Sequence, residues 1–257
     1  MTGGRVTYVG HATVLLELSG LRILTDPVLR SRVAHLHRRA PAPDARVAED
    51  LDAVLISHLH FDHADLPSLR KLERRTPVLA PPGAGAFLER RGIAAVTELA
   101  PGRSIAIGEL TIAAVEARHG RGRSPLTKGS EAVGFRLTGE SDIYFAGDTD
   151  LFEGMRELAP GLDLALLPIW GWGPRLGPGH LDPERAARAA ALLSPRLAVP
   201  IHWGTFFPLG PSRRRDRLTE PPHEFARWCA ELAPQVETRT LAPGERAPIP
   251  GEPPRVR

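Results

Sequence analysis

The densest group of chemically active side chains is the hexapeptide HLHFDH at positions 58–63. It directly follows the apolar run AVLIS and precedes Asp65, whose type is typical of a helix start. Residues two apart at the end of a strand point to the same face, so His58 and His60 can hold one ion together. Asp62 and His63 follow where the chain turns and would point toward a second position nearby. Imidazole and carboxylate groups suit zinc, with iron or manganese as alternatives.

Two ions need more ligands than this run supplies, and three further residues stand in similar places. His119 follows LTIAAVEAR, Asp148 follows DIYFAG, and His202 follows LAVPI, so each lies where an apolar strand would end. Taken alone, each is equally an ordinary turn or surface residue. Beside the hexapeptide they are the natural partners, because a two-metal centre needs them and a carboxylate can bridge both ions.

Two other histidines also follow apolar segments. His180 ends the loop PIWGWGPRLGPGH, which is rich in Gly, Pro and Trp, a composition typical of functional loops. We predict that His180 contacts substrate or the transition state, and a structural loop histidine is the alternative. His11, in YVGHAT, is expected to bond to the loop backbone. The remaining histidines, in polar or proline-rich segments, are interpreted as surface residues: His35, His37 and His223.

Strands and helices alternate along the chain and must position these residues. Strands are predicted for the short apolar runs RVTYVG, ATVLLEL, LRILTDP, DAVLIS, PVLAPP, LTIAAVEA, VGFRLTG, DIYFAGD, LALLPI and LAVPIHW. Helices are predicted for residues 66–75 after Asp65, for residues 84–92, for residues 184–193 after Asp182 and Pro183, and for the amphipathic window HEFARWCAEL. This mixture indicates an α/β or α+β chain.

The two halves of the chain share a weak internal echo. In the first, a strand ending at Asp26 is followed by LDAVLIS, a helix and VLAPP; in the second, a strand ending at Asp148 is followed by LDLALLP, a helix and LAVPI. Two such halves, each a sheet with helices on one side, would stack into a four-layer αββα sandwich. Strand composition shared by chance is the alternative.

Length and composition limit the remaining possibilities. With 257 residues, 42% of them hydrophobic, we expect one domain over residues 1–247 and a proline-rich tail over 248–257. The single cysteine, Cys229, excludes an intrachain disulfide and favours a reducing compartment. The opening MTGGRVTYVG has no signal-peptide pattern, and no 18 apolar residues run together. We therefore expect a cytoplasmic protein without an integral membrane segment.

The charge pattern argues against nucleic acid as a partner. The formal net charge is only +3, and basic residues, 31 of them arginine, are scattered instead of gathered in one segment with aromatic residues between them. A small-molecule substrate is the expectation that remains.

Taken in order, these residues resemble the five motifs of the metallo-β-lactamase superfamily, with Asp26 in LTDP as a further member, over about residues 5–245. The segments GHATVLLE, LTDPV, AGDTD, HLDPE and PIHWGTF resemble the branch of N-acylphosphatidylethanolamine phospholipase D and the ascorbate-6-phosphate lactonases. The resemblance implies the αββα fold and two ions. It gives His58, His60 and His119 to one ion, Asp62, His63 and His202 to the other, with Asp148 bridging, Asp26 orienting a ligand, and His180 beside the substrate.

The implied activity is hydrolysis by a hydroxide that bridges two divalent metal ions, zinc being expected, with Asp62, Asp148 and His180 catalytic. Asp148 stands where the main zinc β-lactamases have cysteine, and only 53 residues separate it from His202, which argues against antibiotic hydrolysis and an inserted nuclease domain. Arg121, Arg123 and Arg175 could clamp a phosphate, and Trp170 and Trp172 suit an apolar group. A phosphodiester with an apolar substituent is predicted; the alternatives are a lactonase or other carboxylic ester hydrolase, or a non-catalytic metal-binding protein.

Overall fold

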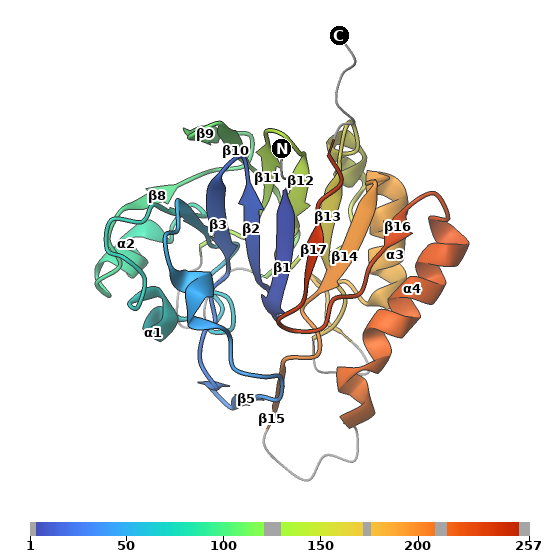
Figure 1. Cartoon of the computed structure of the whole chain (residues 1–257), viewed down its shortest axis with the longest axis horizontal. Helices are drawn as coiled ribbons and strands as arrows, with labels where there is room; N and C mark the ends of the chain where they lie inside the picture. The colour runs from blue at the N-terminus through green and yellow to red at the C-terminus, as the bar shows by residue number, and fades with distance from the viewer. Residues whose placement is uncertain (1–3, 121–129, 172–175, 209–214, 252–257) are drawn as a thin grey trace.

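The computed structural model describes residues 4–120, 130–171, 176–208 and 215–251 (Figure 1). Within these ranges the strands form two seven-stranded sheets and one small three-stranded sheet. The first sheet contains, in hydrogen-bonded order, β17 (Arg246–Pro248), β1 (Arg5–Gly10), β2 (Thr13–Leu18), β3 (Leu21–Thr25), β6 (Ala53–Leu55), β7 (Val78–Ala80) and β8 (Val96–Glu98). The second contains β16 (Glu237–Thr238), β14 (Leu197–Ile201), β13 (Leu164–Pro168), β12 (Ile143–Phe145), β11 (Val133–Thr138), β10 (Leu110–Glu116) and β9 (Ser104–Ile107).

The two sheets face each other across one large hydrophobic core. Alternate residues of a strand point to opposite faces, so Val14 and Leu16 of β2 belong to this core, whereas Leu15 between them packs on the outer side with Val47. The second sheet contributes Phe135 and Leu166, both completely buried, to the same core. The predicted pairing of two sheets through their apolar faces is therefore confirmed.

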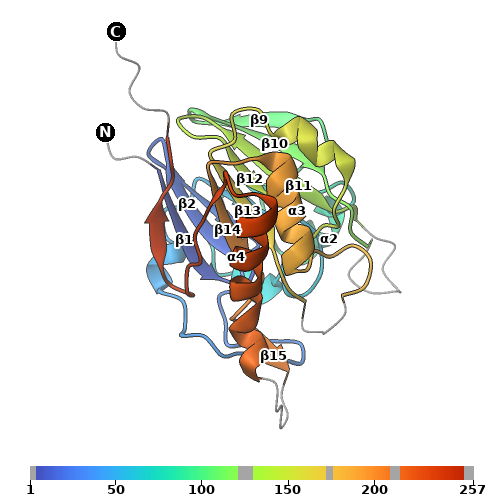
Figure 2. The same cartoon turned by 90° about the vertical axis from the view of Figure 1, so that its right-hand side faces the viewer.

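Helices cover the outer faces. The short helices α1 (Leu66–Leu69) and α2 (Gly85–Glu89) lie beside the first sheet, and α3 (Pro183–Leu193) and α4 (Glu220–Leu232) lie beside the second (Figures 1 and 2). The described part of the chain also contains three 3-10 helices: η1 (Ala45–Ala48), η2 (Glu153–Leu158) and η3 (Arg215–Leu218). This arrangement is the predicted four-layer αββα sandwich.

The helix starts agree with the sequence, but two helices are shorter than predicted, and α2 ends at Glu89 instead of residue 92. Asp182 caps α3 by accepting a hydrogen bond from the Arg185 N–H at 2.8 Å. Asp65 caps α1 in the same way, yet α1 ends at Leu69, not at residue 75. Beyond that point Leu72 bonds to the residue three positions earlier, which is the tighter 3-10 pattern, and this turn keeps Leu69 and Leu72 both buried.

Parallel strands gather the loops that carry polar residues. In the first sheet β3, β6 and β7 are parallel neighbours, and in the second β12, β13 and β14 are parallel neighbours. These are the strands of the internal echo. Because the carboxyl ends of parallel strands meet at one edge of a sheet, the loops after β3, β6, β12 and β14 lie at one rim of the sandwich.

Several short edge strands have no signal in the sequence. The small sheet consists of β15 (Phe206–Pro208), β5 (Leu36–Arg38) and β4 (Arg32–Val33). Near the end of the chain β17 pairs with β1, and Ile249 is buried with its N–H bonded to the Gly4 carbonyl. The predicted tail boundary near Pro248 stays a prediction, and residues 252–257 lie outside the described ranges. No helix in the described ranges is long and apolar enough to cross a membrane.

Candidate metal centre

The hexapeptide HLHFDH forms the loop between β6 and α1. Its backbone turns at His60, whose carbonyl accepts hydrogen bonds from the N–H groups of His63 and Ala64 at 3.1 and 2.9 Å. Asp65 then caps α1 and binds Arg30 at 2.7 Å. The loop is therefore anchored at its end by a capped helix, while its histidines and Asp62 face the rim between the two sheets.

A first cluster consists of His58, His60 and His119, whose ligand atoms all lie within 4.8 Å of one another. His119 reaches the hexapeptide from the end of β10, with its Nε2 at 3.1 Å from His60 Nδ1. The other nitrogen of His119 donates to the Gly179 carbonyl at 2.7 Å. His58 Nε2 is buried and has no hydrogen-bond partner among the described residues, while its Nδ1 lies 3.0 Å from Ser57 Oγ.

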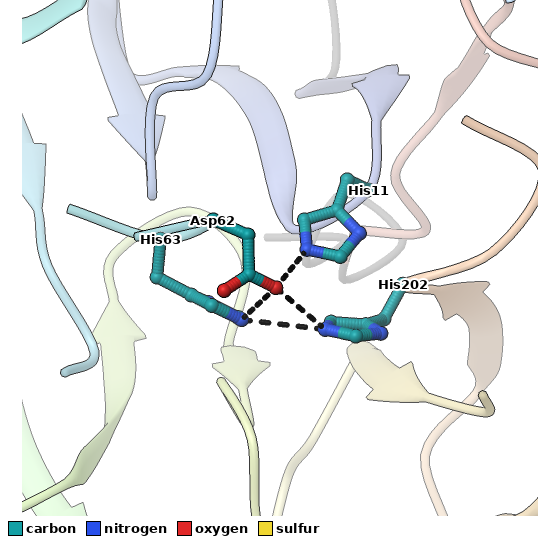
Figure 3. Close-up of side chains that lie close together, drawn as sticks. All are labelled: His11, Asp62, His63 and His202. Atoms are coloured by element: carbon teal, nitrogen blue, oxygen red, sulfur yellow. Dashed lines mark hydrogen bonds and ion pairs between the residues drawn. The ribbon is translucent and has the colours of Figure 1, made fainter. Parts of the chain in front are cut away.

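A second cluster consists of Asp62, His63 and His202, and His11 lies against it (Figure 3). The Nε2 atoms of His63 and His202 are 3.3 Å apart, and Asp62 Oδ2 lies 3.7 and 3.8 Å from them. His202 follows β14 and contacts the Trp170 carbonyl through its Nδ1. His63 and His202 thus turn one nitrogen outward to the protein and the other inward.

Asp148 lies between the two clusters. It follows β12, with one carboxylate oxygen 3.4 Å from His63 Nε2 and the other 3.4 Å from His202 Nε2. It also lies within 4.8 Å of the ligand atoms of His119, which belongs to the first cluster. All seven residues predicted as ligands are therefore brought together at the rim.

Asp26 stabilises this arrangement through hydrogen bonds to Ser57 and His63. It is completely buried at the end of β3 and accepts hydrogen bonds from the Ser57 N–H at 2.7 Å, from Ser57 Oγ at 2.5 Å and from His63 Nδ1 at 2.7 Å. A carboxylate in this place holds the proton of His63 Nδ1 and directs Nε2 inward, where its lone pair becomes available when a cation takes the place of the second ring proton.

Left-handed backbone conformations bring these loops close together. Asp26, with φ +33°, and His202, with φ +64°, adopt values that are uncommon for residues other than glycine. Gly147 has φ +59°, and a Cβ there would lie 2.5 Å from Ser57 Cβ. Glycine therefore permits the close approach of the Asp148 loop to the hexapeptide loop.

Burial and charge set the protonation of the cluster. Burial lowers the pKa of His60 to about 4 and also lowers the pKa values of His58, His119 and His202. The inward nitrogens of these rings are therefore neutral electron-pair donors at pH 7.

His63 is the exception among these histidines. Burial opposes a charge on it, yet the carboxylates of Asp148, Asp62 and Asp26 raise its pKa well above the usual value. Burial likewise acts against the charges on Asp148 and Asp62, but the neighbouring histidines hold the pKa values of both carboxyls well below their usual range. The group thus favours positive charge at its centre, as a divalent cation would supply.

The spacing of the donor atoms also fits a metal ion. A tetrahedral ion with ligands at about 2.0–2.1 Å separates neighbouring ligand atoms by about 3.3 Å. The distances among His63 Nε2, His202 Nε2 and the Asp148 oxygens, 3.3–3.4 Å, match this separation. The first cluster offers three imidazoles, and the buried Nε2 of His58 has no partner among the described residues. The second offers both imidazole and carboxylate donors, and the two sets suit zinc, manganese or iron.

His180 lies at the edge of the clusters. Its side chain is about one-third exposed, its Nε2 is 3.8 Å from Asp148 Oδ2, and its ring meets the ring of His119 edge-on at 4.7 Å. Gly179, just before it, is tied to Asp150 by a hydrogen bond at 3.1 Å. The histidine is thus both accessible and held beside the donors.

Trp170 begins the loop that leads to His180. Its ring is buried, stacks on Phe207 and lines a cavity of about 520 Å³ between the starts of α3 and α4, together with Leu176 and Trp228. The other residues singled out for substrate contact lie outside the described ranges: Arg121, Arg123, Trp172 and Arg175.

His11 lies closer to the clusters than its sequence context indicates. Its backbone does bond to a loop, as expected, but its ring reaches Asp62, with Nε2 at 2.9 Å from Oδ2. The available signal was its position at the end of a strand, which His119 and His202 share. His35 and His223 are exposed as expected, whereas His37 is half-buried in β5.

Comparison with known proteins gives a consistent result. The family model of the β-lactamase superfamily domain matches residues 21–203. A metal-dependent hydrolase from Rubrobacter xylanophilus is 35% identical over 256 residues, which cover 95% of this chain and 97% of the relative. An N-acyl-phosphatidylethanolamine-hydrolyzing phospholipase D from Caenorhabditis elegans is 31% identical over 245 residues, covering 83% of this chain and 68% of the relative.

Two further comparisons concern length and fold. This chain spans 64% of the length of a Mycobacterium tuberculosis relative that is 35% identical over 240 residues. Among solved structures, Igni18, a metallo hydrolase from Ignicoccus hospitalis, superposes with a TM-score of 0.72 at 24% identity, covering 96% of this chain and 98% of that one. At this identity the likeness concerns the fold.

Proposed function

Since this chain belongs to the metallo-β-lactamase superfamily, we propose that it is a metal-dependent hydrolase that binds two divalent ions. The observation that carries the proposal is the position of Asp148 between two clusters of imidazole and carboxylate donors. A single ion in the second cluster would leave the buried His58 Nε2 of the first without a partner among the described residues, which is costly.

The proposed ligands divide as the two clusters do. His58, His60 and His119 would hold one ion, and Asp62, His63 and His202 the other, with the Asp148 carboxylate shared between them. Zinc is the ion we expect from this donor set, with manganese or iron as alternatives. When bound, such ions supply a nucleophilic water at neutral pH and positive charge for the oxygens of the substrate.

The residues behind the ligands determine how well the donors are aimed. Asp26, the Gly179 carbonyl and the Trp170 carbonyl each contact the outward nitrogen of a ligand histidine, so the inward nitrogen is presented in one orientation. Removing such partners typically costs 10 to 100-fold in metal affinity. These contacts support a built metal centre.

We propose that His180 contacts the reacting part of the substrate. Its Nε2 is close to Asp148 without being hydrogen-bonded to it, and the side chain is partly accessible. From this place it can donate a proton or a hydrogen bond to negative charge that develops on the substrate. Asp62 and Asp148 would take part by holding the ions, and no serine or cysteine nucleophile is needed.

For the substrate we favour a phosphodiester with an apolar substituent. Two observations support this choice. The relative from Caenorhabditis elegans is a phospholipase D. Trp170, whose carbonyl contacts His202, lines a cavity with the apolar side chains of Leu176 and Trp228 and with charged residues that include Arg217. A lactonase or other carboxylic ester hydrolase is the alternative within the same chemistry. A non-catalytic metal-binding protein is the alternative outside it.

Metal analysis followed by a substrate panel tests this proposal. We expect purified protein loaded with zinc, manganese or iron to retain close to two ions per chain. Metal loading that stays near zero overturns the site, and retention near one overturns the two-ion centre. The panel compares an aryl phosphodiester, an acyl lactone and a sugar-phosphate lactone in one buffer, with His35→Ala as a surface control and Asp148→Asn as the inactive control.

The relative rates identify the bond that is cut. We expect the highest kcat/KM on the phosphodiester. A value on either lactone a hundredfold higher, about 2.7 kcal/mol of transition-state preference, would reverse the choice of substrate. Loss of turnover on all three substrates at full metal loading would favour the non-catalytic alternative.

A further inference from the structure

His11 is held in the turn between β1 and β2 with little freedom to move. Its N–H bonds to Thr205 Oγ1 at 2.8 Å, and its carbonyl accepts from the His202 N–H at 2.8 Å. Its φ is +59°, which is unfavourable for most residues. The loops after β1 and β14 are thus joined at His11, and the strained conformation is maintained on both sides.

The ring of His11 is fixed as firmly as its backbone. The residue is only 1% exposed, and its ring lies 3.9 Å from the ring of His202 and meets Phe206 edge-on at 5.6 Å. In this orientation Nε2 is directed at Asp62 Oδ2, the same oxygen that faces His63 and His202 (Figure 3).

The distances between donor atoms distinguish the role of His11 from that of the ligands in the second cluster. His63 Nε2 and His202 Nε2 are 3.3 Å apart, the separation of two ligands of one ion, whereas His11 Nε2 and Asp62 Oδ2 are 2.9 Å apart, the usual length of an N–H···O hydrogen bond. An ionised carboxylate only accepts, so the His11 nitrogen donates. A nitrogen that carries this proton has no lone pair for a metal.

We propose that His11 is a positioning residue, which fixes the rotation of the Asp62 carboxylate so that Oδ2 faces the inward nitrogens of His63 and His202. The inference rests on the proposed metal centre, in which Asp62 is a ligand of the second ion. The competing assignment is that His11 itself serves as a fourth protein ligand of that ion, because its Nε2 also lies within 4.8 Å of the other donors.

Two substitutions distinguish these assignments. In His11→Gln the side-chain amide nitrogen can take the place of imidazole Nε2 as a donor, but an amide nitrogen has no free lone pair for a metal. In His11→Asn the side chain tolerates the left-handed backbone, but it is too short to reach Asp62. The pair therefore separates loss of the hydrogen bond from loss of a ligand, and His11→Asn avoids the strain that alanine would add.

The measurement is zinc affinity, determined by titration against a competing chelator and by metal content after dialysis. Melting of the metal-free proteins serves as the control for folding. If His11 positions Asp62, His11→Asn should weaken the more easily lost ion by about 10 to 100-fold, and His11→Gln should stay within about threefold of wild type. His35→Ala, an exposed histidine, should leave both affinities unchanged.

A double substitution tests whether His11 acts through Asp62. Asp62→Asn alone should weaken the same ion, and adding His11→Asn should weaken it no further, because the partner of the hydrogen bond is already changed. Fully additive losses would overturn the proposal. So would equal losses in His11→Gln and His11→Asn, which indicate a ligand, or wild-type affinity in both.

The result remains distinct from a failure of the proposed function. If wild-type protein retains fewer than two ions, the two-metal centre itself is wrong. If wild type retains two and the variants behave alike, the metal centre stands and the role of His11 is wrong. Should His11→Asn not fold, the comparison of Asp62→Asn with Asp62→Asn/His11→Gln still decides, because only a ligand role predicts a further loss of zinc.

Discussion

His63 Nδ1 and Asp26 Oδ2 lie 2.7 Å apart, and both side chains are completely buried. Asp26 comes from the loop after β3 and His63 from the loop after β6, two parallel neighbours in the first sheet. The same carboxylate accepts from the backbone and the hydroxyl of Ser57. One buried carboxylate therefore stabilises the rim and also orients a proposed ligand. Asp148 is itself a proposed ligand, so substitutions of the two residues can be told apart by their effects on metal binding.

Asp26→Asn and Asp148→Asn should differ in their effects on metal. We expect Asp26→Asn to lower the free energy of unfolding of the metal-free protein by about 1–3 kcal/mol, because a buried acceptor is lost. Asp148→Asn should also destabilise the metal-free protein, because the charge that faces His63 is lost, but it should cost more metal, since its charge would serve both ions. Thermal melting and metal content per chain provide the comparison. Greater metal loss in Asp26→Asn would contradict the bridging role of Asp148.

Gly147→Ala should destabilise the rim through a collision. A Cβ at this position would lie 2.5 Å from Ser57 Cβ, and φ is +59°. Gly20→Ala is the matched control, because Gly20 has φ +75° but no atom within 4 Å of its Cβ position. Strain alone should cost about 1–2 kcal/mol in the control. A clearly larger loss is expected for Gly147→Ala in denaturant titrations, and equal losses would show that the contact yields easily.

His180→Ala should separate catalysis from metal binding. If His180 contacts the substrate, the variant should keep wild-type metal content and melting temperature while kcat/KM falls by about 10 to 1000-fold. Exposed His223 provides a matched histidine-to-alanine control. Unchanged kinetics in His180→Ala would show that the histidine has only a structural role. A loss of metal that accounts for the loss of activity would indicate the same.

Cys229 should react slowly with thiol reagents in the folded protein. It is 1% exposed on α4, and burial raises the pKa of its thiol to about 12, so almost no thiolate is present at pH 8. Alkylation at pH 8 should be slow in buffer and rapid in denaturant, as followed by mass spectrometry. The thiol of the unfolded protein loses its proton at a lower pH than the buried thiol. The contribution of Cys229 to the free energy of unfolding should therefore fall as pH rises from about 9 to about 12. Rapid alkylation of the native protein would show that α4 opens.

The sequence by itself determined the longer apolar strands and the helix starts, and it singled out the residues that are proposed as donors. Apolar runs that end at Asp26, Asp148 or His202 carry information about both the strand and the loop that follows it, because a buried parallel strand is continuously apolar and its end is polar. The four-layer arrangement was expected from the same local signals, because two similar halves bury their apolar faces best by packing against each other. These properties depend on near neighbours in the chain.

Only the tertiary structure decided how distant residues meet. The contact between His11 and Asp62 joins positions 51 residues apart and was not expected from the sequence. That between His63 and His202 joins positions 139 residues apart and was implied by the family resemblance, not by the local pattern. The early end of α1 and the pairing of β17 with β1 likewise depend on which surfaces the rest of the chain covers. A side chain's partner is set by the packing of both sheets together, and a local pattern of residue types contains no record of that packing.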